Sequence, residues 1–196
     1  MDVKSRREEY AETTRAAILD AATARFTADG FAGTTVDQVA EAARVTKGAV
    51  YHHFRDKAEL LEAAFVQMEE RLVVTVAAAT EGIDDPWEEF ARGVDAFLEA
   101  CLEPGFRRIA LEEAPAVLGW ARWKDIEERY FLGLMVASLD GLARAGLIRV
   151  PPGDLTARML LAAISEAGLA VAAADDPDEE RTRVGVLVGQ LVRGLR

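Results

Sequence analysis

Three helix-start signals follow one another within 22 residues and constrain the fold of this chain more than any other feature. Thr35-Val-Asp-Gln38 fits a capping box, Thr46 is placed to cap the next segment, and Asp56-Lys-Ala-Glu59 opens a third. Only a few residues separate these segments, so the first two helices must be very short. Helices of that length are unstable alone in water and must pack on their neighbours. The spacing therefore predicts two short helices that cross around a tight turn, followed by a longer one.

Apolar residues recur with the 3.6-residue period of a helix along nearly the whole chain, and no convincing run alternates with period two. The sequence therefore predicts an all-α protein. A first helix should run from about Ser5 or Thr13 to Ala28 and end at Asp29-Gly30, where glycine accommodates a left-handed conformation. The other expected helices are 35–43, 47–54, 57–80, 86–102, a shorter one up to Pro115, then 116–145, 154–173 and 178–195, which makes about nine in total.

Charge divides the chain into two parts. The net charge of −11 argues at first sight against a nucleic-acid partner. Residues 1–57, however, hold nine basic and nine acidic residues, whereas residues 58–196 hold 14 basic and 25 acidic ones. We therefore expect two domains with separate tasks, 1–57 and 58–196.

Several classes of protein are excluded by composition. The single cysteine, Cys101, rules out an internal disulfide framework and makes a Cys-based zinc site implausible. No uninterrupted apolar stretch approaches the roughly 18 to 20 residues that span a bilayer. The N-terminus carries charges every few residues, unlike a secretory signal. No nucleophile–base set, metal spacing or phosphate loop indicates an enzyme. We expect a soluble cytoplasmic protein with no membrane partner, catalytic residues, metal or cofactor.

The segment 35–57 separates an inward from an outward set of side chains. The inward set is small or apolar and comprises Val36, Val39, Ala40, Val45, Val50 and Phe54. The outward set of the third helix mixes cationic, hydroxyl, imidazole and methyl groups, from Thr46, Lys47, Ala49, Tyr51, His52, His53 and Arg55. Such a face suits base edges and phosphates in a major groove better than a hydrophobic partner. Free backbone N–H groups at the starts of both short helices can also bind phosphates.

A longer pattern surrounds this segment and covers about 50 residues. It comprises Ile18-Leu19-Asp20-Ala21-Ala22, Phe26, Gly30-Phe31, Thr34-Thr35-Val36, Val39-Ala40, the run ARVTKGAVYHHFRDK from Ala43 to Lys57, and Leu60-Leu61. This pattern closely resembles the DNA-binding domain of TetR-family repressors. The resemblance implies a three-helix DNA-binding domain with a helix-turn-helix, a fourth connecting helix, and a C-terminal helical bundle that dimerises and binds a small effector.

The resemblance also implies roles for individual residues. Lys47, Ala49 and His52 would face base edges, whereas Tyr51 and His53 would lie against the DNA backbone. Thr35 and Lys57 would each hold a phosphate. The predicted DNA-contacting set is Thr35, Arg44, Thr46, Lys47, Gly48, Ala49, Tyr51, His52, His53 and Lys57.

Arg44 departs from the family pattern, which usually has glycine in the turn before the recognition helix. If this position has a positive φ, arginine costs about 1 kcal/mol relative to glycine. Its side chain could gain a phosphate contact in return.

Other basic and imidazole groups leave alternatives open. His52-His53 suggests metal binding, but neighbours on a helix point about 100° apart and no third ligand is near, so we expect no metal site. Arg55 is as consistent with a solvated charge as with a DNA contact. Lys4, Arg6 and Arg7 fit either a disordered tail or a basic arm.

Large side chains concentrate in the middle of the chain, where a helical bundle could hold a cavity. The expected effector pocket comprises Phe90, Phe97, Phe106, Glu112, Trp120, Trp123 and Tyr130, although any one of them could simply belong to the core. Trp120 and Trp123 with Glu112 or Glu113 could hold a lipophilic cation. Arg107 or Arg108 would instead select an anion, and the sequence does not decide between the two.

The last two helices are the expected dimer interface. Their predicted interface residues are Leu155, Met159, Ala163, Ala167, Val184, Leu187, Val188 and Leu191. Two such helices from each subunit would form a four-helix interface, and a dimer would place two recognition helices in successive major grooves, about 34 Å apart. Either face could instead pack only within its own subunit.

These features predict a dimeric repressor that binds a near-palindromic double-stranded operator and is released by a small-molecule effector. A DNA-binding protein without a ligand and an activator of the same fold are the alternatives. A helical enzyme is a further alternative of another class, and it lacks a supporting motif.

Overall fold

The structure is a computed structural model that describes residues 6–149 and 154–195, and within these ranges it contains helices and turns but no strand. The elements are α1 (Arg6–Gly33), α2 (Val36–Ala42), α3 (Lys47–His53), α4 (Lys57–Thr80), α5 (Pro86–Ala100), α6 (Pro104–Phe106), the π-helix η1 (Arg107–Glu113), α7 (Ala114–Leu118), α8 (Trp120–Arg144), α9 (Leu155–Ala173) and α10 (Pro177–Arg193). Because α6, η1 and α7 run on without a break, the described residues form nine helical segments, and the predicted all-α fold is confirmed. The predicted cap at Ser5, the side chains of the N-terminal basic residues and the turn at 151–153 lie outside the described residues.

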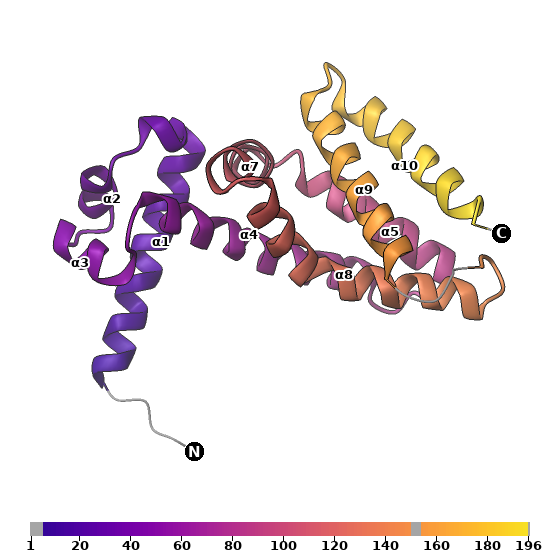
Figure 1. The fold of residues 1–196 in the computed structure, drawn as a ribbon, viewed down its shortest axis with the longest axis horizontal. Coiled ribbons are helices and arrows are strands. Elements are labelled where there is room, and N and C mark those ends of the chain that lie inside the picture. Colours follow the sequence, from indigo (N-terminus) through magenta and orange to yellow (C-terminus); the bar gives the residue numbers. More distant parts are fainter. Residues whose placement is uncertain (1–5, 150–153, 196) are drawn as a thin grey trace.

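An N-terminal unit, residues 6–56, packs α2 and α3 against α1 at one end of the molecule (Figure 1). Its core side chains include Ile18, Phe26, Val39 and Val50, each no more than 1% exposed. Gly30 adopts φ 74° and ψ 173°, which kinks the chain at the predicted end of the first helix. The Thr34 hydroxyl donates to the carbonyl of Gly30 at 2.8 Å and closes this corner.

A C-terminal bundle, residues 86–195, places α9 and α10 beside α5 and α8 (Figure 1). Phe90, Leu98, Leu142 and Val171 belong to its core. Helix α9 is long and apolar enough to cross a membrane by composition, a possibility that the sequence argument had set aside. In this structure α9 instead contacts α5, α8, α10 and η1, so its apolar residues largely serve the bundle.

Helix α4 joins the two parts. Asp56 caps it, accepting from the backbone N–H of Glu59 at 2.8 Å as the sequence predicts. One continuous core runs from the N-terminal unit along α4 to η1 and α8, and it includes Leu60, Phe65 and Ile126. A shift of α4 therefore moves the N-terminal unit relative to the bundle.

The predicted helix end at Pro115 is wrong. Pro115 lies near the start of α7, just after the π-helix, and its missing amide hydrogen leaves a carbonyl of the preceding turn without a helical bond. The Trp123 indole N–H donates to the carbonyl of Ala110, five residues before Pro115, at 2.8 Å. The backbone N–H of Ala114 bonds to the carbonyl of Ile109, five residues back, so the helix continues through this point. The break comes at Gly119, whose φ of 82° ends α7, and α8 starts at Trp120 instead of near Ala116.

Candidate nucleic-acid interface and ligand cavity

Both short helices begin where their capping residues predict. The Thr35 hydroxyl accepts from the backbone N–H of Gln38 at 3.3 Å, and the Gln38 side chain accepts from the backbone N–H of Thr35 at 2.8 Å. At α3 the Thr46 hydroxyl accepts from the backbone N–H of Ala49 at 3.1 Å. These bonds satisfy amide groups that the first helical turn leaves free.

The turn between α2 and α3 has the geometry of a Schellman motif. The backbone N–H of Val45 donates to the carbonyl of Ala40 at 2.9 Å, and that of Arg44 donates to the carbonyl of Glu41 at 3.0 Å. Arg44 has φ 56°, and it is the one residue other than glycine with positive φ among those described. The condition under which arginine is costlier than glycine at this position is therefore met.

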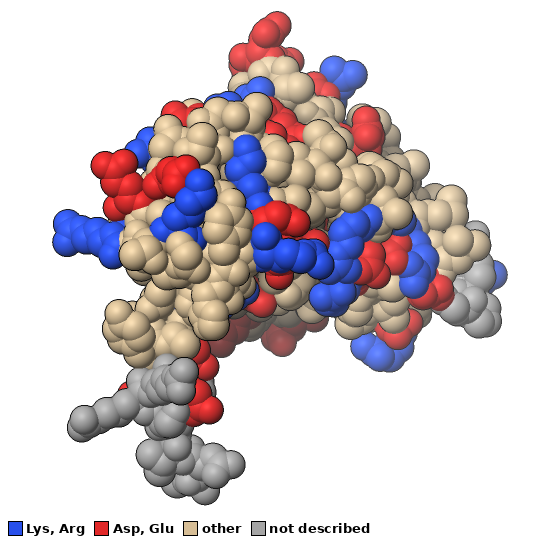
Figure 2. Space-filling model, turned by 60° about the vertical axis from the view of Figure 1, so that its left-hand side comes forward, with Lys and Arg blue, Asp and Glu red and all other residues tan. Residues whose placement is uncertain are grey.

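Helix α3 presents one apolar and one polar face. Val50 and the following Phe54 are 1% and 2% exposed, so they anchor the helix on α1. Lys47, Tyr51 and His52 are exposed on the other side. Figure 2 turns this end of the molecule forward and shows basic and acidic side chains interspersed there. Recognition by this face would therefore depend on individual side chains.

Lys47 is paired within the unit. Its ammonium donates to the Asp37 carboxylate at 2.7 Å, and both side chains are more than half exposed. This hydrogen bond to Asp37 raises the pKa of Lys47. Because the pair is solvated, it costs little to separate, and a phosphate or base edge could replace Asp37.

Lys57 has a structural role that its sequence context did not reveal. Its ammonium donates to the carbonyls of Phe31 and Thr34 at 2.6 and 2.8 Å and lies 4.2 Å from the centre of the Phe31 ring. These contacts tie the end of α1 to the start of α4. An ammonium has three hydrogens, so one remains for the predicted phosphate contact.

The two histidines do not form a metal site with other residues. Their rings contact edge to face at 5.3 Å, and burial, followed by the charges of His52 and Arg15, lowers the pKa of His53. Within the described ranges no group of three His, Cys, Asp or Glu side chains could hold a metal ion.

A clasp formed by Arg108 and Glu113 of η1 connects the bundle to the kink in α1. The Glu113 carboxylate accepts from the backbone N–H of Phe31 at 2.9 Å, and Arg108 donates to the carbonyl of Ala28 at 3.3 Å. A Cβ atom at Gly30 would lie 2.5 Å from the Arg108 guanidinium, so this close approach requires glycine. Arg108 and Glu113 therefore hold the N-terminal unit and do not reach a ligand cavity.

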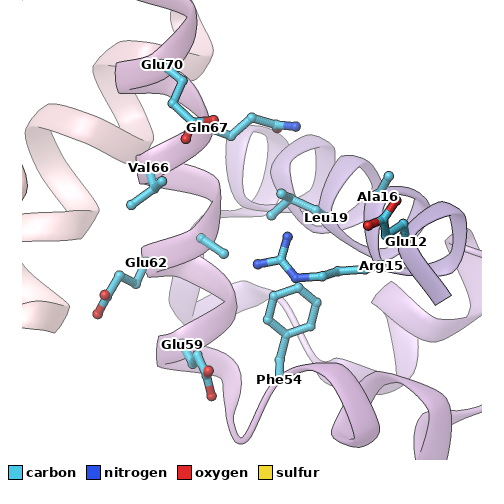
Figure 3. A pocket seen from close by; sticks show the side chains of 11 residues that line it. Glu12, Arg15, Ala16, Leu19, Phe54, Glu59, Glu62, Val66, Gln67 and Glu70 are labelled. Atoms are coloured by element: carbon cyan, nitrogen blue, oxygen red, sulfur yellow. The ribbon is translucent and has the colours of Figure 1, made fainter. Parts of the chain in front are cut away.

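An open groove of about 480 Å³ lies between α1 and α4 (Figure 3). The Arg15 guanidinium lies over the Phe54 ring at 5.0 Å, and Glu12, Glu59 and Glu62 lie around it. This groove could not be predicted from the sequence, because its walls come mainly from α1 and α4, which are not adjacent along the chain.

A second cavity, of about 470 Å³, lies inside the C-terminal bundle. Residues of α4, α5, α8 and α9 line it, mostly with apolar side chains: Val76, Ala77, Thr80, Glu89, Phe90, Gly93, Val94, Phe97, Glu127, Phe131, Leu134, Met135, Ala137, Ser138, Gly141, Arg144, Leu161 and Ile164. Its size and apolar lining are typical of small-molecule sites. Phe90 and Phe97, two of the seven residues predicted for an effector pocket, line this cavity.

The other five predicted pocket residues lie elsewhere, because α8 begins at Trp120 and the helix faces differ from those expected. Phe106 is buried in the first core, and the Trp123 indole donates to the carbonyl of Ala110 at 2.8 Å. Trp120 is 60% exposed. Tyr130 donates to Glu70 at 3.2 Å, and Glu112 pairs with Arg107 at 3.1 Å on the surface.

Glu127 is the cavity residue that the sequence reasoning missed. It is only 5% exposed and lies on the inward stripe of α8, four residues after Trp123 and four before Phe131. A carboxylate at helical spacing between two apolar aromatic residues is the signal that could have found it.

The predicted dimer face divides into an exposed and a buried set. Leu155 and Met159 on α9 are 68% and 65% exposed, and Leu187 and Leu191 on α10 are about half exposed. Val184 and Val188 are instead buried in the core of their own subunit, because their side of α10 packs on α5 and α9. Their assignment to a dimer interface is therefore corrected. Ala163 and Ala167 are half-buried.

Comparison with known proteins gives a consistent result along the whole chain. The family described as "Bacterial regulatory proteins, tetR family" matches residues 18–64, and "Tetracyclin repressor-like, C-terminal domain" matches residues 87–195. The Transposon Tn10 TetC protein of Escherichia coli is 24% identical over 163 residues, which cover 82% of this chain and 81% of TetC.

Solved structures share the complete arrangement of helices. A TetR-family transcriptional regulator from Pectobacterium atrosepticum superposes with a TM-score of 0.82 at 31% identity, covering 98% of this chain and 97% of the other. RolR in complex with resorcinol superposes with a TM-score of 0.76 at 18% identity, covering 94% and 89% of the two chains, and this likeness concerns the fold alone.

Proposed function

Because the chain belongs to the TetR family of bacterial transcriptional regulators, we propose that it is a cytoplasmic, dimeric repressor that a small molecule releases from a near-palindromic operator. The named relatives and structural neighbours are regulators rather than enzymes. The observation that carries the proposal is the polar face of α3, which stands on a helix anchored by Val50 and Phe54. Rigid anchoring positions Lys47 and His52 for base edges in a major groove.

The remaining predicted contacts surround this face. Thr35, Thr46 and the exposed Gly48 offer hydroxyl or backbone N–H groups at the starts of α2 and α3, where phosphates bind favourably. The half-buried Ala49 offers only its methyl group, because its backbone N–H is bonded to Thr46. Tyr51 and His53 lie one residue to either side of His52, in reach of the same DNA backbone. Arg44 and Lys57 supply cations at the turn and at the start of α4.

Dimerisation through α9 and α10 would bring two such faces together. Leu155, Met159, Leu187 and Leu191 form an exposed apolar surface on these helices, which a second copy of the chain would cover. A two-fold axis through this surface would bring two copies of α3 to the successive major grooves of a palindromic site.

Release by a ligand would depend on α4. Val76, Ala77 and Thr80 near its end line the bundle cavity, while Lys57 at its start is bonded to the end of α1. A ligand that binds one position of α4 better than another changes the spacing of the two N-terminal units. Coupling of about 1–3 kcal/mol between cavity and operator is enough for a useful switch. The cavity itself favours this mechanism over a ligand-independent DNA-binding protein.

The test is selection of genomic fragments with the purified full-length protein, followed by mobility-shift titration of the recovered operator. Lys47→Ala and His52→Ala should weaken or relax operator binding by about 1–3 kcal/mol. Arg92→Ala is the matched control, because it removes an exposed cation on α5. Operator binding by Lys47→Ala that equals that of the unaltered protein over a range of salt would refute the proposed docking.

A further inference from the structure

Two carboxyl groups are buried on α4 and α8, and the one on α8 lines the bundle cavity. Glu69 on α4 is 3% exposed and Glu127 on α8 is 5% exposed, and Glu127 lines the cavity. Among the described residues neither carboxyl group forms an ion pair. The charge of Lys124 acts on Glu127, but the Lys124 ammonium is paired with Glu128 at 3.4 Å. The burial of a carboxylate without a counter-ion costs free energy, so these two groups need a compensating interaction.

The hydrogen bonds of Ser165 offset only part of this cost. The Ser165 hydroxyl lies 2.9 Å from the carbonyl of Leu161 and also contacts the Glu127 carboxyl group, and it can donate its one hydrogen to either acceptor. Glu127 therefore has a single donor, shared with a backbone carbonyl, and room for a second, charged donor from a ligand.

The electrostatics of the groups around Glu127 agree with this reading. Burial raises the pKa of Glu69 to about 8, with a further contribution from Glu127, and burial also raises the pKa of Glu127. The hydrogen bond from Ser165 and the charge of Lys124 oppose the shift at Glu127. Cys101, at the end of α5, faces both acids, and burial with these two neighbours raises the pKa of its thiol to about 12. None of the three buried groups Glu69, Glu127 and Cys101 supplies a positive charge.

The cavity disfavours an anionic ligand. Of the described residues that line it, only Arg144 is basic, and this residue is exposed near the end of α8. The interior polar groups are the carboxyl group of Glu127 and the hydroxyls of Thr80 and Ser138. Phe97 and Phe131 add aromatic rings, whose faces attract cations.

We propose that the effector is an apolar molecule carrying one cationic amine, and that Glu127 binds this amine as a carboxylate at the inner wall of the cavity. The inference rests on the proposed function, since it takes the cavity as the effector site. On binding, the ammonium pairs with the Glu127 carboxylate, and any proton that the carboxyl group carries leaves to solvent. The apolar body of the ligand lies against Phe90, Phe97 and Phe131.

The same contact gives the ligand a means of moving α4. An ammonium at Glu127 on α8 also attracts Glu69 on α4, once Glu69 loses its own proton. The ligand thus favours a position of α4 closer to α8, and the N-terminal unit follows α4.

Isothermal titration calorimetry of the full-length protein with three matched probes tests the proposal. The probes are 6-phenylhexylamine, 6-phenylhexanol and 6-phenylhexanoate, which share an apolar body and differ in the head group. We expect the amine to bind about 10-fold more tightly than the alcohol, and the carboxylate to bind most weakly. The affinity of the amine should rise with pH across the range in which Glu127 loses its proton, because binding releases that proton. The affinity of the alcohol should not rise.

Neutral variants locate the effect. Glu127→Gln should lower the affinity of the amine by about 10-fold and leave that of the alcohol within about 2-fold, whereas Glu99→Gln, an exposed glutamate on α5, should change neither. Glu69→Gln, on the other helix, should reduce the displacement of operator by the amine. Equal binding of amine and alcohol, binding of none of the probes, or an unchanged head-group preference in Glu127→Gln would overturn the inference. Operator binding by the ligand-free protein tests the proposed function separately, so the two can fail independently.

Discussion

Replacement of Arg44 by glycine should stabilise the protein, although it removes a side chain. Arg44 occupies the left-handed position of the turn between α2 and α3 with φ 56°. A residue with a Cβ atom costs about 1–2 kcal/mol there, because that atom crowds the following carbonyl oxygen. Glycine removes this cost, but its greater backbone freedom stabilises the unfolded chain by about 0.5–1 kcal/mol. The expected net increase in the free energy of unfolding is about 0.5–1 kcal/mol.

The assay is equilibrium unfolding in urea, with thermal unfolding as a second measurement. For a chain of this size, about 1 kcal/mol corresponds to about 2–4 °C in Tm. Arg44→Ala is the matched control, since it removes the same charge but keeps the Cβ atom and hence the strain. We expect Arg44→Ala to lie within about 0.5 kcal/mol of the unaltered protein. A free energy of unfolding for Arg44→Gly no higher than that of Arg44→Ala would refute the conformational argument.

The same two variants also test the predicted phosphate contact of Arg44. Both lack the guanidinium, so both should reduce the salt dependence of operator binding by about one unit of slope if that group contacts a phosphate. The two measurements separate backbone strain from side-chain charge. The free energy of unfolding should differ between Arg44→Gly and Arg44→Ala, whereas the salt dependence of operator binding should be the same for both.

Three further predictions concern other parts of the molecule. Lys57→Met removes two hydrogen bonds to carbonyls at and just after the end of α1, so it should lower the free energy of unfolding in urea by about 1.5–3 kcal/mol. A variant that lost DNA affinity but kept its stability would contradict this structural role. Burial raises the pKa of Glu69 to about 8 in the folded protein, whereas the unfolded chain releases this proton near the ordinary pKa of 4.5. The free energy of unfolding should therefore fall as pH rises between these values, and Glu69→Gln should reduce this dependence on pH. Leu191→Asp should convert the proposed dimer to monomers in sedimentation experiments and leave the helix content unchanged, and a dimer that persists would exclude this face.

Features that depend on residues three or four apart could be predicted from the sequence. Thr35, Thr46 and Asp56 cap the helices that they were expected to cap, because each bond joins a side chain to a backbone amide three residues later. The positive φ of Arg44 was raised only as a possibility, from the glycine that the family usually has in this turn. The DNA-reading face of α3 could be proposed because its helix is short and one apolar side must face inward.

Features that depend on which helices meet were decided by the tertiary structure. Whether Val188 lies in the core or on the surface depends on the packing of α10 against α5 and α9. The break at Gly119 rather than at Pro115 depends on a π-helix, which changes the side that every later residue of the segment presents. The cavity and its acid, Glu127, require four helices from distant parts of the chain. Local hydrogen bonds are determined by neighbouring residues, whereas burial is determined by the surface that another helix provides, and the sequence of one helix does not identify its partner.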